Sequence, residues 1–282
     1  MAALIIAQAP NKPLTVPTHD YDSADDQSLS LQLTPFAQEA NGGSEVIGYQ
    51  MQIDDGQAGP FTTVLGADLD DPAAMTLETQ VQVNNLTKGA VYRARYRAIN
   101  SIGSGEWSNL AYARVAKVPE APPAPVVSSV DETHIQLALT ISSDDGGTGI
   151  TAYHLYINEG ANGTPMHEIM AYDQSALSYT IAAGNVVDTH TVVSGNIYTI
   201  KYLAENAVGK SLDSELLYVA LARKPDTPSP PTFDSARSNK TQIVLRWTEG
   251  ASQDIPVAGY RVYSDGGLPG NSDLIYDGDG VT

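Results

Sequence analysis

The chain has 282 residues, with 15 Lys and Arg against 33 Asp and Glu, which gives a formal net charge of −18. Such an acidic field repels a phosphate backbone, so nucleic acid is not an expected partner. The chain has no cysteine, which excludes disulfides, thiolate catalysis and cysteine-based zinc sites. No apolar run reaches the roughly 18 residues of a membrane-spanning helix, so the sequence predicts no such segment.

A proline-rich phrase returns three times, beginning at Pro10, Pro119 and Pro225. These prolines are 109 and then 106 residues apart. A return at this interval indicates a tandem array of small domains, with the phrase as the joint between them. The prolines favour an extended, semi-rigid joint. The predicted domains are two complete ones at 10–118 and 119–224 and a partial one at 225–282, with residues 1–9 as the last strand of a preceding domain.

After each joint the chain repeats an apolar alternation, a turn and a tyrosine. The alternating runs are residues 29–33, 135–139 and 243–247. A period of two is typical of a half-buried strand. The tyrosines are Tyr49, Tyr153 and Tyr260, each eight residues after a turn residue. Each repeat is therefore predicted to continue from the turn into a second strand.

A further phrase occurs twice at a constant offset of 106 residues. It contains Tyr92 and Asn100 in the first copy and Tyr198 and Asn206 in the second. The constant register predicts a fixed strand and a fixed turn after it. No helical period is sustained anywhere, and short strands with Gly- and Pro-rich turns at this repeat length indicate β-sandwiches.

Together these phrases resemble the fibronectin type III domain over nearly the whole chain. The resemblance implies an all-β fold of tandem immunoglobulin-like, seven-stranded β-sandwiches in a rod-like array. It implies that Tyr92 and Tyr198 form tyrosine corners, in which the hydroxyl bonds to upstream backbone. It also places Trp247 in the core, with Leu33 and Ile141 in its place in the other copies. The family does not fix a function, which must come from sites.

A basic row stands out in the acidic chain. Arg93, Arg95 and Arg97 alternate with inward-facing residues and should share one sheet face, with Trp107 near the end of the row. One interpretation is cross-strand pairing with neighbours such as Asp54. The other is a docking stripe for an acidic partner, including another copy of the chain. Cation–π stacking on Trp107 is expected in either case.

Other chemistry is sparse. The pair His167-Glu168 lacks the second histidine of a zinc-protease helix, and we predict no catalytic residue, no cofactor and no metal site. Acidic residues gather in the predicted loops, so calcium is the one inorganic ligand considered, although no EF-hand spacing is present. Three sequons, at Asn85, Asn162 and Asn239, lie in predicted turns and are candidates for N-glycosylation.

The sequence therefore favours a structural or adhesive segment of a long extracellular or cell-surface rod or filament, without catalysis. Its partners would be proteins, including other copies of itself. A receptor-like ectodomain with its ligand site elsewhere, an accessory module of a secreted glycan-degrading enzyme and a cytoskeletal array remain alternatives.

Overall fold

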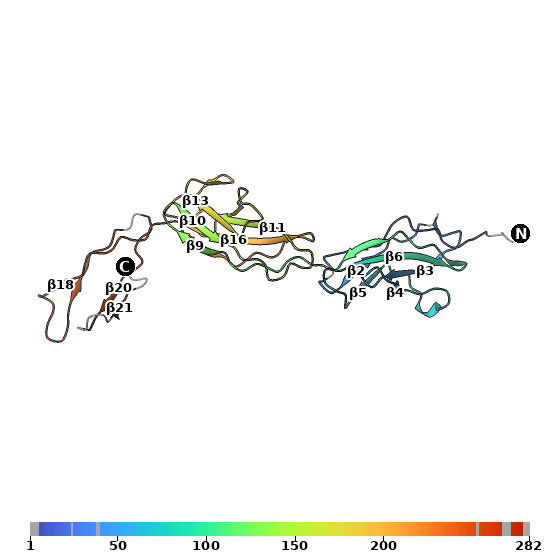
Figure 1. Cartoon of the computed structure of the whole chain (residues 1–282), viewed down its shortest axis with the longest axis horizontal. Helices are drawn as coiled ribbons and strands as arrows, with labels where there is room; N and C mark the ends of the chain where they lie inside the picture. Colours follow the sequence, from blue (N-terminus) through green and yellow to red (C-terminus); the bar gives the residue numbers. More distant parts are fainter. Residues whose placement is uncertain (1–5, 24, 38–39, 252–253, 267–271, 279–282) are drawn as a thin grey trace. The chain divides into compact units, whose positions relative to one another are not determined.

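The computed structural model describes residues 6–23, 25–37, 40–251, 254–266 and 272–278 (Figure 1). The regular elements in these ranges are β-strands and a short 3₁₀-helix, η2 (Pro72–Ala74). No helix among them is long and apolar enough to cross a membrane. The chain forms two compact units, one of residues 1–122, 142–153 and 203–213 and the other of residues 123–141, 154–202 and 214–282. Two segments that follow Pro119 thus belong with the first unit, and the domain boundaries stay a prediction.

The first repeat consists of two antiparallel sheets. One has the order β1 (Thr18–His19), β2 (Leu29–Gln32) and β5 (Gln80–Val83). The other has the order β4 (Thr62–Leu65), β3 (Val46–Ile53), β6 (Val91–Asn100) and β7 (Gly103–Ser104), and β8 (Ala111–Arg114) also pairs with β6. Both sheets contribute to one core, in which Leu31 and Met51 are completely buried.

The second repeat has the same two-sheet plan. One sheet has the order β9 (Val126–Val130), β10 (His134–Ala138) and β13 (Ser178–Ala182). The other has the order β12 (Met166–Glu168), β11 (Ile150–Asn158), β16 (Ile197–Asn206) and β17 (Leu217–Ala220). A separate hairpin pairs β14 (Val186–Val187) with β15 (His190–Thr191). Leu137, Leu155 and Tyr202 are completely buried, and the predicted all-β fold of tandem sandwiches is confirmed.

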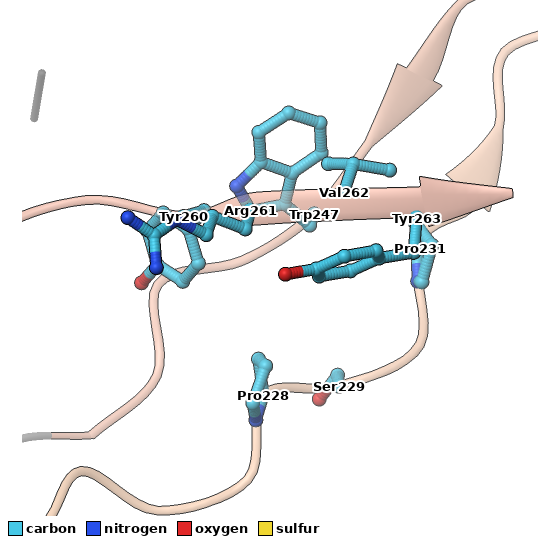
Figure 2. Close-up of a pocket in the computed structure, with 8 residues that line it drawn as sticks. All are labelled: Pro228, Ser229, Pro231, Trp247, Tyr260, Arg261, Val262 and Tyr263. Atoms are coloured by element: carbon cyan, nitrogen blue, oxygen red, sulfur yellow. The ribbon is translucent and has the colours of Figure 1, made fainter. Parts of the chain in front are cut away.

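The third repeat contributes two hairpin-like sheets, β18 (Thr232–Phe233) with β19 (Leu245–Arg246) and β20 (Arg261–Ser264) with β21 (Asp273–Asp277). A pocket of about 180 Å³ lies beside Trp247, Tyr260 and Val262 (Figure 2). In the second repeat the residues that match Tyr260 and Val262 are Tyr153 and Leu155, which are 5% and 0% exposed. The pocket is therefore an uncovered face of core positions and not a built ligand site.

Two sequence predictions about the core need correction. Ile141 is 61% exposed, and the buried residue at the end of that run is Leu139, because β10 ends at Ala138 and its two-residue alternation does not continue as far as residue 141. Trp247 keeps 37% of its surface exposed, since the described residues of the third repeat form two two-stranded sheets and not a full sandwich; its ring lies 6.1 Å from Tyr260 and 5.9 Å from Tyr276 between centroids.

The strand predicted at residues 1–9 falls partly outside the described residues, which begin at residue 6. Residues 6–9 are not part of a strand, although the backbone N–H of Gln8 donates to the carbonyl of Gly42 at 2.9 Å.

Candidate functional site

Each of the first two joints is organised around one buried asparagine. Asn100 ends β6 and is 0% exposed. Its side-chain amide donates to the carbonyl oxygens of Gln8 at 2.7 Å and Asn41 at 2.9 Å. Its Oδ1 accepts from the backbone N–H groups of Ile102 at 2.9 Å and Gly103 at 3.1 Å. One side chain thus ties the segment before the first joint to two turns of the sandwich.

The second joint has the same arrangement around Asn206, which is 4% exposed at the end of β16. Its amide donates to the carbonyls of Lys117 and Asp145, both at 2.8 Å. Its Oδ1 accepts from the N–H groups of Val208 at 2.8 Å and Gly209 at 3.1 Å. We call these two constellations the Asn100 clasp and the Asn206 clasp.

Two glycines bring the joint backbone against the clasp. The N–H of Gln8 donates to the carbonyl of Gly42, and that of Lys117 to the carbonyl of Gly146, both at 2.9 Å. Gly42 and Gly146 have φ of +76° and +74°, and a Cβ there would lie 2.3 Å from the Gln8 oxygen and 2.1 Å from the Lys117 oxygen. Only glycine tolerates both this backbone conformation and this close approach.

Consecutive residues at the start of the second joint are hydrogen-bonded or buried. Val115 still bonds to the backbone of the first sandwich just before β6, donating to Ala90 at 3.0 Å and accepting from Gly89 at 2.8 Å. The following residue, Ala116, is completely buried, and Lys117 is already in the Asn206 clasp. This joint is therefore part of the folded structure and not a free linker.

Charged side chains surround the second joint. Lys88 pairs with Asp144 and, at 3.4 Å, with Asp26, while Lys117 pairs with Glu120 at 2.9 Å. The hydrogen bond to Asp144 raises the pKa of Lys88, and the one to Glu120 raises the pKa of Lys117. The hydrogen bond from Lys88 lowers the pKa of Asp144. Each of these three groups is thus held in its charged form.

The arginine row forms a stack, here called the arginine ladder, of Arg93, Arg95, Arg97, Phe61 and Trp107. The Arg95 guanidinium lies 4.1 Å from the Phe61 ring centroid and 4.4 Å from that of Trp107. Arg97 lies 4.4 Å from the same Trp107 centroid, and Arg93 lies 5.1 Å from Phe61. Trp107 therefore lies against two arginines and does not merely end the row.

Most of the ladder's charge is matched within the sandwich. Arg93 Nε pairs with Asp54 at 2.7 Å, and Arg97 pairs with Asp68 at 2.5 Å. Arg95 instead donates to Gln52 Oε1 at 3.1 and 2.8 Å. Burial, with the neighbouring arginine charges, lowers the pKa of Arg95. This pattern favours the cross-strand interpretation for Arg93 and Arg97, whereas Arg95 is paired with an amide and not with a carboxylate.

Tyrosine hydroxyls fasten loops in each repeat. Tyr92 accepts from the N–H of Thr87 at 3.1 Å, and Tyr198 accepts from Val193 at 2.8 Å, so both form the backbone tie of a tyrosine corner. The sequence did not indicate a second set. The hydroxyls of the three strand tyrosines accept from the N–H of the preceding loop: Tyr49 from Phe36 at 3.0 Å, Tyr153 from Ser142 at 3.2 Å and Tyr260 from Gly250 at 2.7 Å.

The three sequon asparagines, Asn85, Asn162 and Asn239, are all exposed. Exposure permits glycosylation, which stays a prediction.

The acidic loops bond largely to their own backbone: Asp55, for example, accepts from the N–H groups of Gln57 and Gly59, both at 2.9 Å. Within the described ranges no all-oxygen group of three acidic ligands converges as calcium would require.

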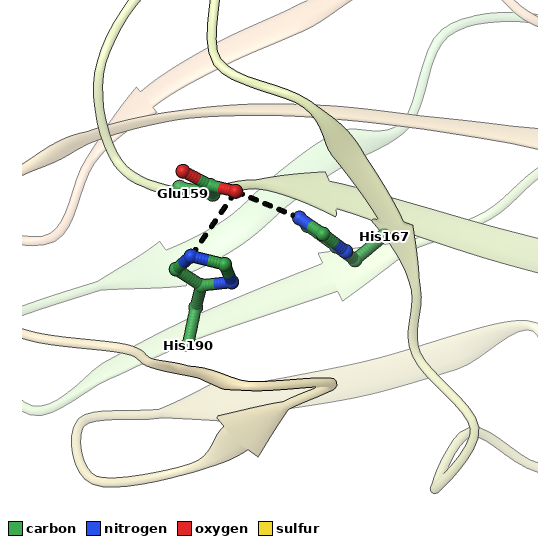
Figure 3. Close-up of side chains that lie close together, drawn as sticks. All are labelled: Glu159, His167 and His190. Carbon is green, nitrogen blue, oxygen red and sulfur yellow. Dashed lines mark hydrogen bonds and ion pairs between the residues drawn. The ribbon is translucent and has the colours of Figure 1, made fainter.

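One converging group of potential metal ligands was missed from the sequence. Glu159, His167 and His190 come from three separate segments, and their ligand atoms lie within 4.8 Å of one another (Figure 3). A search for metal ligands at helical spacing around His167 finds no second histidine. No local spacing could have indicated this group, because the hairpin β14–β15 brings His190 to it.

No model of a known protein family matches the chain. Among curated proteins, sidekick-1 of Mus musculus is 25% identical over 248 residues, which are 85% of this chain and 10% of that protein. Neogenin of Rattus norvegicus is 30% identical over 193 residues, 66% of this chain and 13% of that protein. The chain thus spans only about a tenth of the length of these relatives. Among solved structures, the FN1–FN3 domains of chicken CNTN1 cover 77% of this chain, which covers 69% of them, at 15% identity and a TM-score of 0.43.

The duplicated sandwiches, their tyrosine corners and the curated relatives sidekick-1 and neogenin point to one class. The chain is a tandem array of fibronectin type III domains.

Proposed function

We propose that the chain is a non-catalytic structural or adhesive segment of a longer protein, located outside the cell or on its surface. In this proposal the clasps fix the joints so that the array presents its sheet faces in a defined order. Its partners are proteins, including other copies of the chain, and its loops accept N-linked glycans at Asn85, Asn162 or Asn239.

The duplicated clasp is the observation that carries the proposal. Asn100 and Asn206 each make four hydrogen bonds, to the same kinds of group, at lengths of 2.7 to 3.1 Å. A protein that needed only to tether domains would use a Gly- and Ser-rich linker, which is entropically free. Burying an amide at the first two joints is useful where a joint must hold its conformation. The net charge of −18 supports a solvated, extended array because like charges repel.

Residual dipolar couplings test the structural part. We expect repeats one and two of the natural chain to share one alignment tensor. Asn206→Ala should give each repeat its own tensor, because the clasp is lost. The control Asn162→Ala changes an exposed asparagine and should behave as the natural chain. Independent tensors in the natural chain would contradict the proposal.

Labelling of intact cells of the source organism tests the location. An antibody against the chain should stain unpermeabilised cells or the surrounding matrix, and external protease should remove the signal. Staining that requires permeabilisation would favour the cytoskeletal alternative.

The arginine ladder supports a more specific proposal, that it is the face on which an acidic protein docks. Arg95 is paired with an amide and not with a carboxylate, so its charge is available to a partner. A binding screen with the natural chain and an Arg95→Gln variant tests this: a partner found with the natural chain should be lost with the variant, and equal binding would reject the ladder as the docking face.

A further inference from the structure

Two histidine side chains on the second sandwich converge on a single carboxylate oxygen atom. His167 Nε2 lies 3.0 Å and His190 Nε2 lies 3.1 Å from Oε1 of Glu159 (Figure 3). The two imidazole rings are 4.9 Å apart between centroids. The side chains of Glu159, His167 and His190 are 22%, 19% and 41% exposed, so the group is shielded but open to an entering ion.

Each ligand is held by a different element. Glu159 directly follows β11, and His167 lies in β12, where it is the cross-strand partner of Ile157. His190 opens β15 of the separate hairpin. The sheet edge and the hairpin therefore meet at this group, and their pairing sets the positions of the two rings.

The far side of each imidazole also has an oxygen partner. His167 Nδ1 lies 3.2 Å from Oδ2 of Asp188, and His190 Nδ1 lies 3.4 Å from the Thr189 hydroxyl. Histidines that bind metal through Nε2 almost always engage Nδ1 in this way, because the outer partner fixes the tautomer and orients the ring. Asp188 reaches His167 from the hairpin turn, where it adopts φ of 53°.

We propose that Glu159, His167 and His190 bind a Zn²⁺ ion, with Asp188 as the partner that orients His167. Two imidazoles and one carboxylate form a donor set that zinc commonly takes, whereas calcium requires oxygens alone. Ligand atoms about 2.05 Å from a tetrahedral zinc are about 3.3 Å apart, so the two nitrogen–oxygen separations need to widen by only a few tenths of an ångström. A fourth position remains for water or for a side chain of a partner.

The site would join the hairpin β14–β15 to the edge of the β12–β11–β16–β17 sheet. Without metal, the same contacts are hydrogen bonds between a carboxylate and two rings. When zinc binds, the protons on the two Nε2 atoms leave to solvent, and coordination bonds from both nitrogens and the carboxylate to the ion replace these hydrogen bonds, which fixes the hairpin to the sheet edge. Zinc would therefore reinforce a loop region of the second sandwich that has no counterpart among the paired strands described in the first.

Isothermal titration of the tag-free, EDTA-stripped chain with zinc chloride tests the proposal, with cobalt(II) absorption as the spectroscopic readout. We expect one zinc per chain and the visible bands of a low-symmetry Co²⁺ site. Both signals should disappear in His190→Ala, whose exposed side chain can be removed without opening the core. Asp188→Asn should keep the site but weaken it about 10- to 100-fold, because asparagine tolerates the positive φ and only the orienting charge is lost.

The matched control is His134→Ala, which removes a histidine that is 53% exposed on the same sandwich. It should bind zinc as the natural chain does. Circular dichroism of each variant checks that the fold is kept. The proposal is wrong if the natural chain binds no zinc, if His190→Ala binds as tightly as His134→Ala, or if calcium binds in place of zinc.

Discussion

The two complete repeats share the residues that fix their backbone and differ in what they display on one sheet face. Asp54 and Asn158 occupy matching places, and each accepts the N–H of the partner strand, from Arg93 at 2.8 Å and from Thr199 at 2.9 Å. The Asn100 and Asn206 clasps match bond for bond. Yet the first repeat stacks its arginine ladder on that sheet, whereas the second places Lys201 5.7 Å from the ring of Tyr156.

A comparison of the two repeats distinguishes side chains that the fold constrains from side chains that it leaves free to vary. Side chains that bond to backbone recur in register because the same turns and joints must form in each copy. Side chains on the sheet face and at the sheet edge are free to vary, so the ladder on the first repeat's sheet and the Glu159–His167–His190 group at the second repeat's sheet edge are where the two copies can differ in function. Substitutions in the shared residues should therefore have equivalent effects in both repeats, and substitutions on the sheet faces should not.

The largest effect is expected from the clasp asparagines. Asn100→Ala and Asn206→Ala each remove four hydrogen bonds and leave buried backbone groups unpaired, which should lower the free energy of unfolding by about 3 kcal/mol in the affected sandwich. Amide hydrogen exchange in β6 and β16 measures each sandwich separately. Asn162→Ala should stay within about 0.5 kcal/mol of the natural chain. The two clasps are not equivalent if one of these substitutions lowers the free energy of unfolding by less than about 1 kcal/mol while the other lowers it by the full amount.

A pair of glycines tests the role of close approach at the joint. Gly146→Ala should destabilise the second joint by about 2–3 kcal/mol, because it combines a positive φ with a clash against the Lys117 oxygen. Gly149 has φ of +71°, but a Cβ there would meet no atom of a non-neighbouring residue within 4 Å, so Gly149→Ala should cost only about 1 kcal/mol. Urea denaturation monitored by hydrogen exchange compares them. If the two variants lower the free energy of unfolding equally, the backbone around Gly146 must shift to relieve the clash, and close approach at the joint is not required.

The ladder should contribute more than its counterpart in the second repeat. Arg95→Ala loses two aromatic stacks and should cost about 1–3 kcal/mol, whereas Lys201→Ala should cost less than about 1 kcal/mol. Arg95→Lys keeps the charge but loses the planar stacking surface, and an intermediate cost is expected. Trp107 fluorescence, measured in a Trp247→Phe background, reports unfolding of the first sandwich. A fully stable Arg95→Ala variant would show that the stack contributes no stability.

The smallest effect is the pH dependence of the ion pairs at the second joint. Asp144 has a lowered pKa, so its contribution is present above the ordinary carboxyl pKa and is lost as pH falls through the lowered value. Lys88 has a raised pKa, so its contribution is present below the ordinary lysine pKa and is lost as pH rises through the raised value. Pairs of this exposure contribute up to about 1 kcal/mol. Lys88→Met should flatten the dependence at both ends, and an unchanged profile would exclude the pair as its cause.

Much of the fold was predictable because it depends on local patterns. The two-residue alternation located the strands, the constant 106-residue offset of Tyr92 and Tyr198 located a repeated strand and turn, and the resemblance to fibronectin type III domains implied the tyrosine corners. The prediction for Ile141 was wrong because the strand ends at Ala138, so the core position is taken by Leu139 and the alternation does not extend to residue 141. Trp247 could not be placed from the sequence, since its exposure depends on which strands cover it.

The sites were less predictable for a physical reason. The row of Arg93, Arg95 and Arg97 is visible in the sequence because alternate residues on one strand share a face. The part played by Phe61, in contrast, depends on strand pairing. The same holds for Asn206, whose partners Lys117 and Asp145 lie far away in the chain, and for the histidine group, which needs the β14–β15 hairpin to form.

Hydrogen exchange at the Lys117 amide distinguishes a folded joint from a free linker, because this N–H donates to Gly146 inside the joint. We expect the amide to be protected about as strongly as those of neighbouring strands, and Asn206→Ala to abolish the protection while β6 is unaffected. Exchange at the rate of an unstructured peptide in the natural chain would contradict a structured joint and, with it, the role proposed for the clasps.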